Sequence, residues 1–319
     1  MPTLRSCTWL LTLGLALCSC KKGEDKADDG KADGKAASKD TKGEADAAGS
    51  DEGEASLVVA EGDDNVDGPI PPEASMVLFS IEGALMPLAC FDKASGAVKS
   101  GKACLAMVKE GEAVRLDAGF SNARNKSAGG PVVPQCLAGA GKEVAIGVEG
   151  LSDVNYKFAT WPPAGVRAVK LVKDDTMGGS ALSVDDDTKA KLLAAIQKNK
   201  ASAKGEVELH QVAEVDLDGN PTKEVFYSVF IKNPKMSEQY LWSGIFVATD
   251  GKTDALSLVE KSKSLKDIFE LRATVDMDGK DAREVWLRLV WAEGGGDRLY
   301  QKKGGAFEPL GQWTCGAAR

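Results

Sequence analysis

Apolar residues between positions 70 and 175 occur in short runs, with Gly, Pro and Asn between them. Runs of this kind are typical of β-strands, and no apolar pattern with helical spacing extends over the region. The pattern predicts an all-β domain over residues 70–175, built as a sandwich or a barrel-like sheet. The predicted strands cover residues 76–81, 104–108, 113–116, 144–148, 156–161 and 166–172.

A helix is predicted after a linker at residues 176–184. Three aspartates at 185–187 precede apolar residues at 192, 193 and 196, and lysines follow at 198 and 200. Acids at the start and bases at the end match the helix dipole. The apolar residues share one face, so we expect this face to pack against the core.

The C-terminal half contains a tandem repeat with an offset of 60 residues. In each copy a strand-like run leads into Asp-x-Asp-Gly, at 216–219 and 276–279, and a glutamate, Glu224 or Glu284, opens the next run. Further strands near 240–248 and 297–301 occupy similar places in the two copies. Each unit is predicted to be a small antiparallel meander. The expected fold is therefore mainly β, with a helix and two β-meander repeats over residues 176–319.

The segments VDLDGNPTKEV and VDMDGKDAREV resemble the loops of FG-GAP-type repeats, many of which bind calcium. The resemblance implies Ca²⁺ ligands at the first, third, fifth and ninth places of the first loop, which are Asp216, Asp218, Asn220 and Glu224. These side chains and a backbone carbonyl near residue 222 suit a cation that takes six to eight oxygen ligands. In the second loop Lys280 takes the fifth place, where an ammonium would repel a cation.

A plain hairpin turn is the alternative interpretation of both loops. Asp-Gly is a strong turn former, and aspartate side chains hydrogen-bond their own backbone. If either loop does bind an ion, we expect the role of that ion to be structural.

The first twenty residues have the charge and apolarity of an export signal. Arg5 supplies a positive start, and an apolar run follows over residues 9–17. The run is shorter than the ~20 apolar residues that cross a membrane. It therefore predicts a removable signal.

The end of this run, Leu17-Cys18-Ser19-Cys20, resembles the bacterial lipobox. The resemblance implies cleavage before Cys20, a signal peptide over residues 1–19, and several acyl chains on Cys20 that anchor the chain to a membrane. Lys21 is not the aspartate that commonly retains such proteins on the inner membrane, which points to the outer membrane. Lipid on Cys18 and an ordinary secretory signal are the alternatives.

Residues 20–68 are predicted to be a disordered, charged tether. The stretch consists almost entirely of Lys, Asp, Glu, Ala, Gly and Ser, which bury too little apolar surface to fold. All its lysines lie before residue 43, so its basic end would lie next to the lipid and its acidic end next to the body. The simpler interpretation is a soluble spacer. Because the tether carries nearly all of the net charge of −8, the body is almost neutral. That argues against a nucleic-acid partner.

Four cysteines of the body, at 90, 104, 136 and 315, are disulfide candidates in an exported chain. Three pairings are possible. Cys90 and Cys104 flank a turn and would cross-link a hairpin, which leaves Cys136 for Cys315. Their spacing lacks the close pairs of a zinc site.

No catalytic motif accompanies the single histidine, His210, which we expect to be exposed. Phosphate-binding and dinucleotide-binding motifs are also absent from the sequence. We therefore expect a lipid-anchored protein of the bacterial cell envelope that binds or scaffolds, with an envelope protein or a glycan as its partner. The alternative is a surface glycan hydrolase that uses paired carboxylates.

Overall fold

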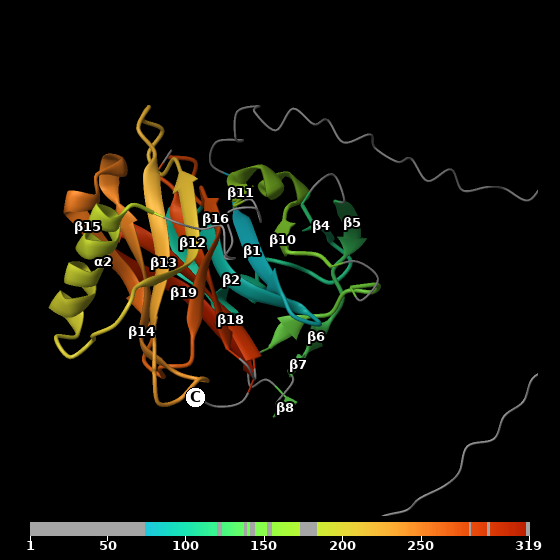
Figure 1. Cartoon of the computed structure of the whole chain (residues 1–319). Helices are drawn as coiled ribbons and strands as arrows, with labels where there is room; N and C mark the ends of the chain where they lie inside the picture. Colours follow the sequence, from blue (N-terminus) through green and yellow to red (C-terminus); the bar gives the residue numbers. More distant parts are fainter. Residues whose placement is uncertain are drawn as a thin grey trace, which may run out of the picture. The chain divides into compact units, whose positions relative to one another are not determined.

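The computed structural model describes residues 74–119, 123–136, 139–140, 144–151, 155–172, 184–280, 282–291 and 294–316. It confirms a mainly β fold with one substantial helix (Figure 1). The predicted signal peptide, Cys20 and the tether lie outside these residues. Among the described helices, none has the length and apolar character needed to span a membrane.

The first part of the body is one curled antiparallel sheet of eight strands in the order β5-β4-β10-β1-β2-β9-β6, with β3 paired to β2. Its central strand β1 pairs with β2 and β10 and alternates between two cores: Val77 and Phe79 face one, Met76 and Leu78 the other. The strands are β1 (Met76–Ile81), β2 (Leu85–Asp92), β3 (Ala97–Ser100), β4 (Ala113–Asp117), β5 (Arg124–Ser127), β6 (Pro131–Val132), β9 (Ala145–Ile146) and β10 (Phe158–Trp161). A separate pair is formed by β7 (Gln135–Cys136) and β8 (Gly139–Ala140).

The predicted strands at 76–81 and 113–116 are confirmed by β1 and β4, but the predicted strand at 104–108 is wrong. This segment contains a short helix, α1 (Lys102–Leu105). Gly101, with a φ of 59°, turns the chain out of β3 in a conformation that residues with a Cβ avoid. The apolar residues at 104–108 therefore follow one another as they would in a strand, but this segment pairs with none of the described strands.

The C-terminal half consists of two antiparallel meanders, as the repeat predicts. The first contains β12 (Glu208–Val215), β13 (Glu224–Lys232), β14 (Tyr240–Ala248) and β15 (Leu256–Lys261), with two short 3-10 helices, η3 (Thr249–Gly251) and η4 (Thr253–Ala255), between β14 and β15. The second contains β16 (Ile268–Val275), β17 (Glu284–Trp291), β18 (Gly294–Lys303) and β19 (Ala306–Gly316).

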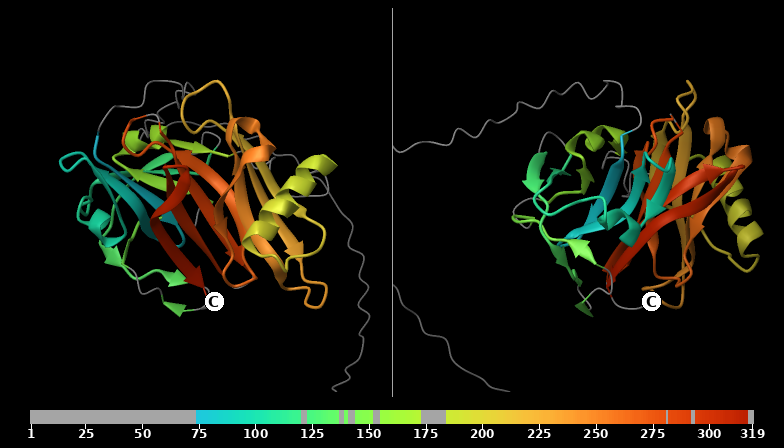
Figure 2. Two further views of the ribbon diagram at one scale, coloured as in Figure 1. Left: turned by 90° about the vertical axis from the view of Figure 1, so that its left-hand side faces the viewer. Right: turned by 180° about the vertical axis from the view of Figure 1, so that it is seen from behind.

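The second meander lies between the curled sheet and the first meander, as both views of Figure 2 show. One core joins residues of the curled sheet, such as Leu88 and Phe158, to Trp286 and Trp313 of the second meander. A second core joins the two meanders through Phe226 and Phe269.

The division into domains at residue 175 stays a prediction, but the two halves share more than a linker. Strand β11 (Val169–Leu171), which follows the 3-10 helix η1 (Pro163–Ala168), pairs with β16 of the second meander. The last strand of the predicted first domain is thus an edge strand of the sheet that follows.

The predicted helix is confirmed as α2 (Asp186–Asn199). Asp185 caps it by accepting the backbone N–H of Thr188 at 2.6 Å, in the way that aspartate satisfies a free amide at a helix start. Leu192 and Ile196 are buried against the outer face of the first meander, where Figure 1 shows the helix.

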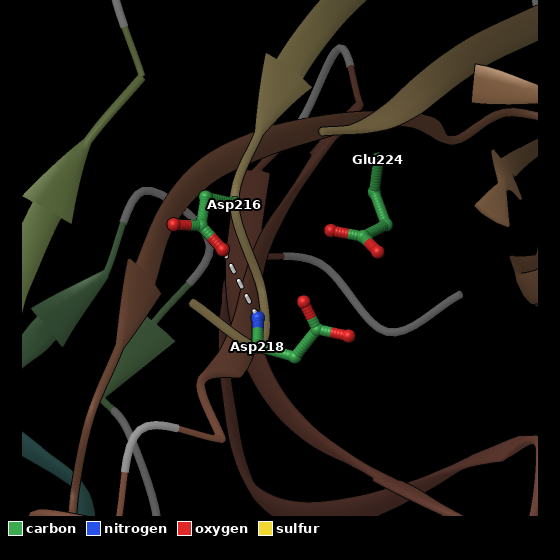
Figure 3. A group of neighbouring side chains, drawn as sticks. All are labelled: Asp216, Asp218 and Glu224. Carbon is green, nitrogen blue, oxygen red and sulfur yellow. Dashed lines mark hydrogen bonds between the residues drawn. The ribbon is translucent and has the colours of Figure 1, made fainter. Parts of the chain in front are cut away.

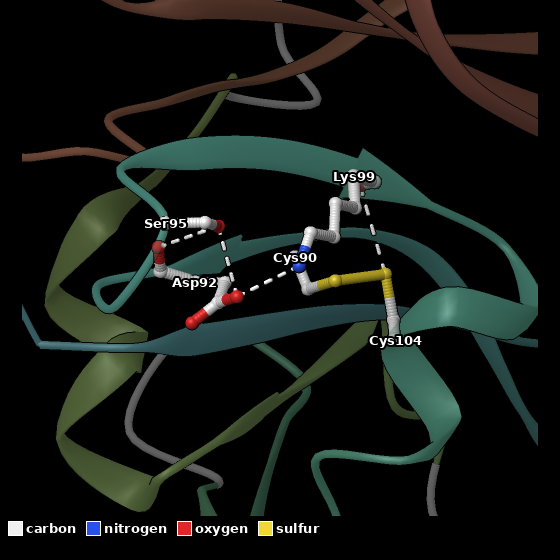
Figure 4. The surroundings of a disulfide bond; sticks show 5 residues. All are labelled: Cys90, Asp92, Ser95, Lys99 and Cys104. Atoms are coloured by element: carbon white, nitrogen blue, oxygen red, sulfur yellow. Dashed lines mark hydrogen bonds and ion pairs between the residues drawn. A yellow bond between two sulfur atoms is a disulfide. The ribbon is translucent and has the colours of Figure 1, made fainter.

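The predicted disulfide between Cys90 and Cys104 is confirmed, and it ties β2 to α1 across the hairpin (Figure 4). The Sγ atom of Cys104 lies 3.6 Å from the carbonyl oxygen of Lys99, whose ammonium pairs with Asp92 at 2.7 Å. Cys315 is also disulfide-bonded. The side chain of Cys136 lies outside the part of the chain that the structure describes, so the Cys136–Cys315 pairing stays a prediction.

Candidate metal centre

The first aspartate loop closes the hairpin between β12 and β13. Asp216 follows the last residue of β12, and Glu224 is the first residue of β13, paired with Val215. The second loop repeats this arrangement between β16 and β17, where Val275 pairs with Glu284. The strand register therefore brings the aspartates and the glutamate of each loop to the same end of a hairpin.

Short-range hydrogen bonds fold the first loop. Asp216 Oδ1 accepts the backbone N–H groups of Asp218 at 3.2 Å and Gly219 at 2.7 Å. Asp218 Oδ1 accepts the N–H of Asn220 at 3.3 Å, and Asn220 Oδ1 accepts that of Thr222 at 2.7 Å. The turn chemistry expected of Asp-Gly is thus present. It orients three polar side chains at alternate positions, those of Asp216, Asp218 and Asn220, toward backbone amides of the loop.

Three carboxylates meet inside this loop. Ligand oxygens of Asp216, Asp218 and Glu224 all lie within 4.8 Å of one another, and Figure 3 shows the Glu224 carboxylate pointing toward the two aspartates. In the part of the chain that the structure describes, none of the three forms an ion pair with a Lys or Arg within 4.0 Å. Like charges at this separation repel one another, so the arrangement favours a bound cation.

Glu224 is the most informative member of the group. The residue is 0% exposed. Oε2 accepts the N–H of Leu217 at 3.0 Å, whereas Oε1 is buried and accepts no hydrogen bond from another described residue. Burial, and secondarily the charge of Asp218, raise the pKa of this carboxyl. A buried acceptor without a donor is costly, and a cation at Oε1 would remove that cost.

The donor set fits a hard divalent cation. Asp216, Asp218 and Glu224 offer carboxylate oxygens, and Asn220 offers an amide oxygen within the same loop. Oxygen ligands of mixed charge in a tight loop are what Ca²⁺ takes, whereas Zn²⁺ and copper favour nitrogen or sulfur. Of the four residues that the sequence predicts as ligands, Asp216, Asp218 and Glu224 therefore lie together, and Asn220 belongs to the same loop. Calcium binding by this loop stays a prediction.

In the second loop, a side chain of the loop itself balances part of the negative charge. Lys280 Nζ lies 2.8 Å from Asp278 Oδ2, so the residue at the fifth place is itself a cation. Glu284 Oε2 accepts the N–H of Met277 at 3.1 Å, as Glu224 does with Leu217. Burial raises the pKa of Glu284 to about 7. The expectation that Lys280 excludes a metal from this loop stays a prediction.

The two loops are joined by Arg283, which the sequence does not single out. Its backbone N–H donates to the carbonyl of Leu217 at 2.8 Å. Its guanidinium is buried and donates to the carbonyl of Ala168 at 2.7 Å and to Thr274 Oγ1 at 2.9 Å. The first loop is therefore connected through Arg283 to the second loop and to η1.

His210 is not exposed, contrary to the expectation from its strand pattern. A β-bulge lies at this position in β12, so the simple alternation of faces does not hold there. Its Nε2 atom lies 3.1 Å from Glu270 Oε1 of the second meander, and both side chains are partly buried. The pair connects the two repeats and has no serine or cysteine nucleophile among its described partners.

Four of the tryptophans offer little surface for a glycan. Trp242, Trp286, Trp291 and Trp313 are all buried, and Trp286 lies at the centre of a core. A groove of about 440 Å³ is lined by Pro87, Ser100, Gly101, Val144, Pro309, Leu310, Gly311 and Gln312. None of these described lining residues carries a carboxylate.

Comparison of this chain with known protein families, with curated proteins and with solved structures finds no significant match.

Proposed function

We propose that this chain is a lipid-anchored protein of the bacterial cell envelope whose β-rich body binds or scaffolds and does not catalyse. In this proposal Cys20 carries the lipid, residues 20–68 form the tether, and the first aspartate loop holds a structural Ca²⁺ ion. The export-type leader, the Leu-Cys-Ser-Cys segment and the charged stretch after it support the address.

One observation carries the calcium site. The Oε1 atom of Glu224 is fully buried, has no hydrogen-bond donor, and faces the carboxylates of Asp216 and Asp218. Turn formation alone accounts for the two aspartates, because both accept backbone N–H groups. It does not account for a third carboxylate that is buried against them.

Calorimetric titration of the purified protein with Ca²⁺ tests the site. We expect one bound ion per chain and loss of binding in Asp218→Asn and Glu224→Gln, which keep the size of each side chain. Asp278→Asn, at the matching position of the second loop, is the control and should bind as the wild type does. Absence of binding to the wild type, or equal binding by all variants, would contradict the site.

The hydrolase alternative has weaker support. The pocket lined by Asp276 and Asp278, beside the second loop, has a volume of only about 30 Å³. The groove of about 440 Å³ contributes no described carboxylate, and Asp297 and Glu284 are buried and hydrogen-bonded within the cores. Incubation of the protein with envelope glycans is the direct assay. Release of soluble fragments that is lost in a carboxylate variant would overturn the binding interpretation.

Mass spectrometry of the native protein tests the anchor. We expect a mature chain that begins at Cys20, with a mass increase that corresponds to a diacylglyceryl group and an acylated amine. A Cys20→Ser variant should remain unprocessed. A mature chain that retains residues 1–19, or begins elsewhere without lipid, would contradict the envelope assignment.

A further inference from the structure

The seam between the two meanders brings equivalent positions of the repeat together. His210 contacts Glu270, and the Gln211 side chain contacts the backbone of Leu271 twice: Nε2 donates to the carbonyl at 3.0 Å, and Oε1 accepts the N–H at 2.6 Å. Both contacts join residues 60 positions apart. Strands β12 and β16 therefore lie side by side in the same direction, and the loops that follow them emerge at the same end.

Side chains of the first meander hold the backbone of β16, and of the residue before it, along this seam. The hydroxyl of Ser228 on β13 donates to the carbonyl of Phe269, and that of Ser243 on β14 donates to the carbonyl of Asp267. On this edge of β16, β11 pairs only with the stretch from Ala273 to Val275. The seam thus depends on side-chain hydrogen bonds where a sheet would have a continuous ladder.

The first aspartate loop lies at one end of the seam, and Leu217 connects the two. The Leu217 side chain is buried in the core between the meanders. Its N–H donates to Glu224 Oε2 at 3.0 Å, and its carbonyl accepts the N–H of Arg283 at 2.8 Å. One residue between two of the candidate ligands therefore contacts the carboxylate cluster, the shared core and the second loop.

We propose that a divalent cation bound in the first loop locks this seam, so that ion occupancy sets how often the first meander separates from the second. This inference rests on the calcium site proposed above. The second loop carries Lys280 as a permanent cation and anchors to η1 through Arg283. Of the two loops, the first is the one whose closure responds to free ions.

The physical reason is linkage between binding and opening. When the seam opens, Leu217 leaves the core and the bond between its N–H and Glu224 is strained or lost, so the ligand set no longer holds its geometry. An ion that binds only the closed seam reduces the open population by a factor. This factor is one plus the ratio of the free ion concentration to the dissociation constant. At ten times the dissociation constant, opening becomes about tenfold rarer.

Hydrogen exchange of the full-length protein, read by mass spectrometry at several Ca²⁺ concentrations, tests the lock. Calorimetry on the same sample supplies the dissociation constant. We expect amides of β12 and of the Ile268–Leu271 half of β16 to exchange about tenfold more slowly at ten times that constant. Amides of β1 and β4, in the curled sheet, are the internal control and should not change.

The outcomes separate this inference from the site on which it rests. If calorimetry detects no Ca²⁺ binding, the proposed site fails and the lock fails with it. If Ca²⁺ binds but seam amides exchange at an unchanged rate, the site stands and the lock is wrong. Slowing of equal size in β1 and β4 would also overturn the lock, because it would show general stabilisation.

A pair of variants sharpens the test. Asp218→Asn removes a ligand and leaves the core intact, so we expect no Ca²⁺-dependent slowing at the seam. Leu217→Ala keeps the four candidate ligands but shortens the side chain that reaches the core, so it should still bind Ca²⁺ and show a smaller slowing. Met277→Ala, its counterpart in the second loop, should keep the full effect. An equal response of Leu217→Ala and Met277→Ala would contradict the role of Leu217.

Discussion

The two aspartate loops have nearly the same backbone arrangement and differ in how their negative charge is balanced. In each, the residue between the two aspartates is buried and donates its N–H to the glutamate that opens the next strand. Lys280 contacts Asp278 in the second loop, whereas Asn220 holds the same place in the first. The comparison shows that a lysine balances the aspartates of one repeated hairpin, whereas the same place in the other holds a neutral side chain, which is where we propose an ion.

Within the seam, the two repeats differ most clearly at the equivalent positions 211 and 271, which are Gln and Leu. We expect Gln211→Leu to lower the free energy of unfolding by about 3 kcal/mol, because the N–H and carbonyl of Leu271 both lose a buried partner. Chemical denaturation measures the change. Gln312→Leu, on an exposed part of β19, is the control and should stay within about 0.5 kcal/mol. Equal stabilities of the two variants would show that the seam does not depend on this side chain.

A pH titration of stability distinguishes the second loop. The folded Glu284 carboxyl has a pKa of about 7, while the ordinary value is 4.5, so the folded protein favours the protonated form. Its stabilising contribution is complete below the ordinary pKa and is lost as the pH rises toward and through 7. We expect a loss of about 3 kcal/mol over that range, and Glu284→Gln should remove the slope.

Denaturation midpoints between pH 4.5 and 8 provide this measurement. Glu110→Gln, at an exposed position, is the matched control and should keep the wild-type slope. A wild-type slope in Glu284→Gln would assign the effect to another group.

Substitution of the fifth residue of the first loop tests whether a lysine can take the place of the ion. We expect Asn220→Lys to abolish Ca²⁺ binding and the stabilisation that accompanies it, which is about 2.7 kcal/mol at a hundredfold excess over the dissociation constant. Thermal unfolding with and without Ca²⁺ measures the difference. Asn220→Gln keeps a neutral amide and should retain part of the response. Undiminished Ca²⁺ stabilisation in Asn220→Lys would contradict the comparison.

The reverse substitution, of a lysine by an asparagine in the second loop, is expected to have the smallest effect on stability. Lys280 is largely exposed, so water screens its pairing with Asp278, and Lys280→Asn should cost about 0.5 kcal/mol. The same variant should gain a weak second Ca²⁺ site from Asp276, Asp278 and Glu284. Calorimetry would then report two ions per chain. One ion per chain in this variant would show that charge alone does not separate the loops.

The sequence was most informative where local chemistry decides the structure. Asp185 and the apolar residues after it predicted α2, because a cap and a single buried face suffice for a helix. The offset of 60 residues predicted the two meanders. The aspartates and Glu224 were also found by spacing, since a hairpin brings its two ends together whatever the rest of the chain does.

Prediction from the sequence failed where contacts between distant segments determine the local structure. Residues 104–108 have the composition of a strand, but Gly101 and the bond from Cys90 to Cys104 place a short helix there. The half-buried state of His210 results from a bulge and from Glu270, which lies in the other repeat. Neither effect has a signal within a short window of sequence.

The sequence by itself determined the mainly β character, the helix, the repeat and the set of oxygen donors in the first loop. Each of these follows from periodicity or from neighbours along the chain. Only the tertiary structure decided that β11 joins the second meander, that Leu217 lies in the core between the meanders, and that Glu224 Oε1 is buried without a donor. Burial is the reason, because the environment of an atom depends on segments that the chain brings together only after it has folded.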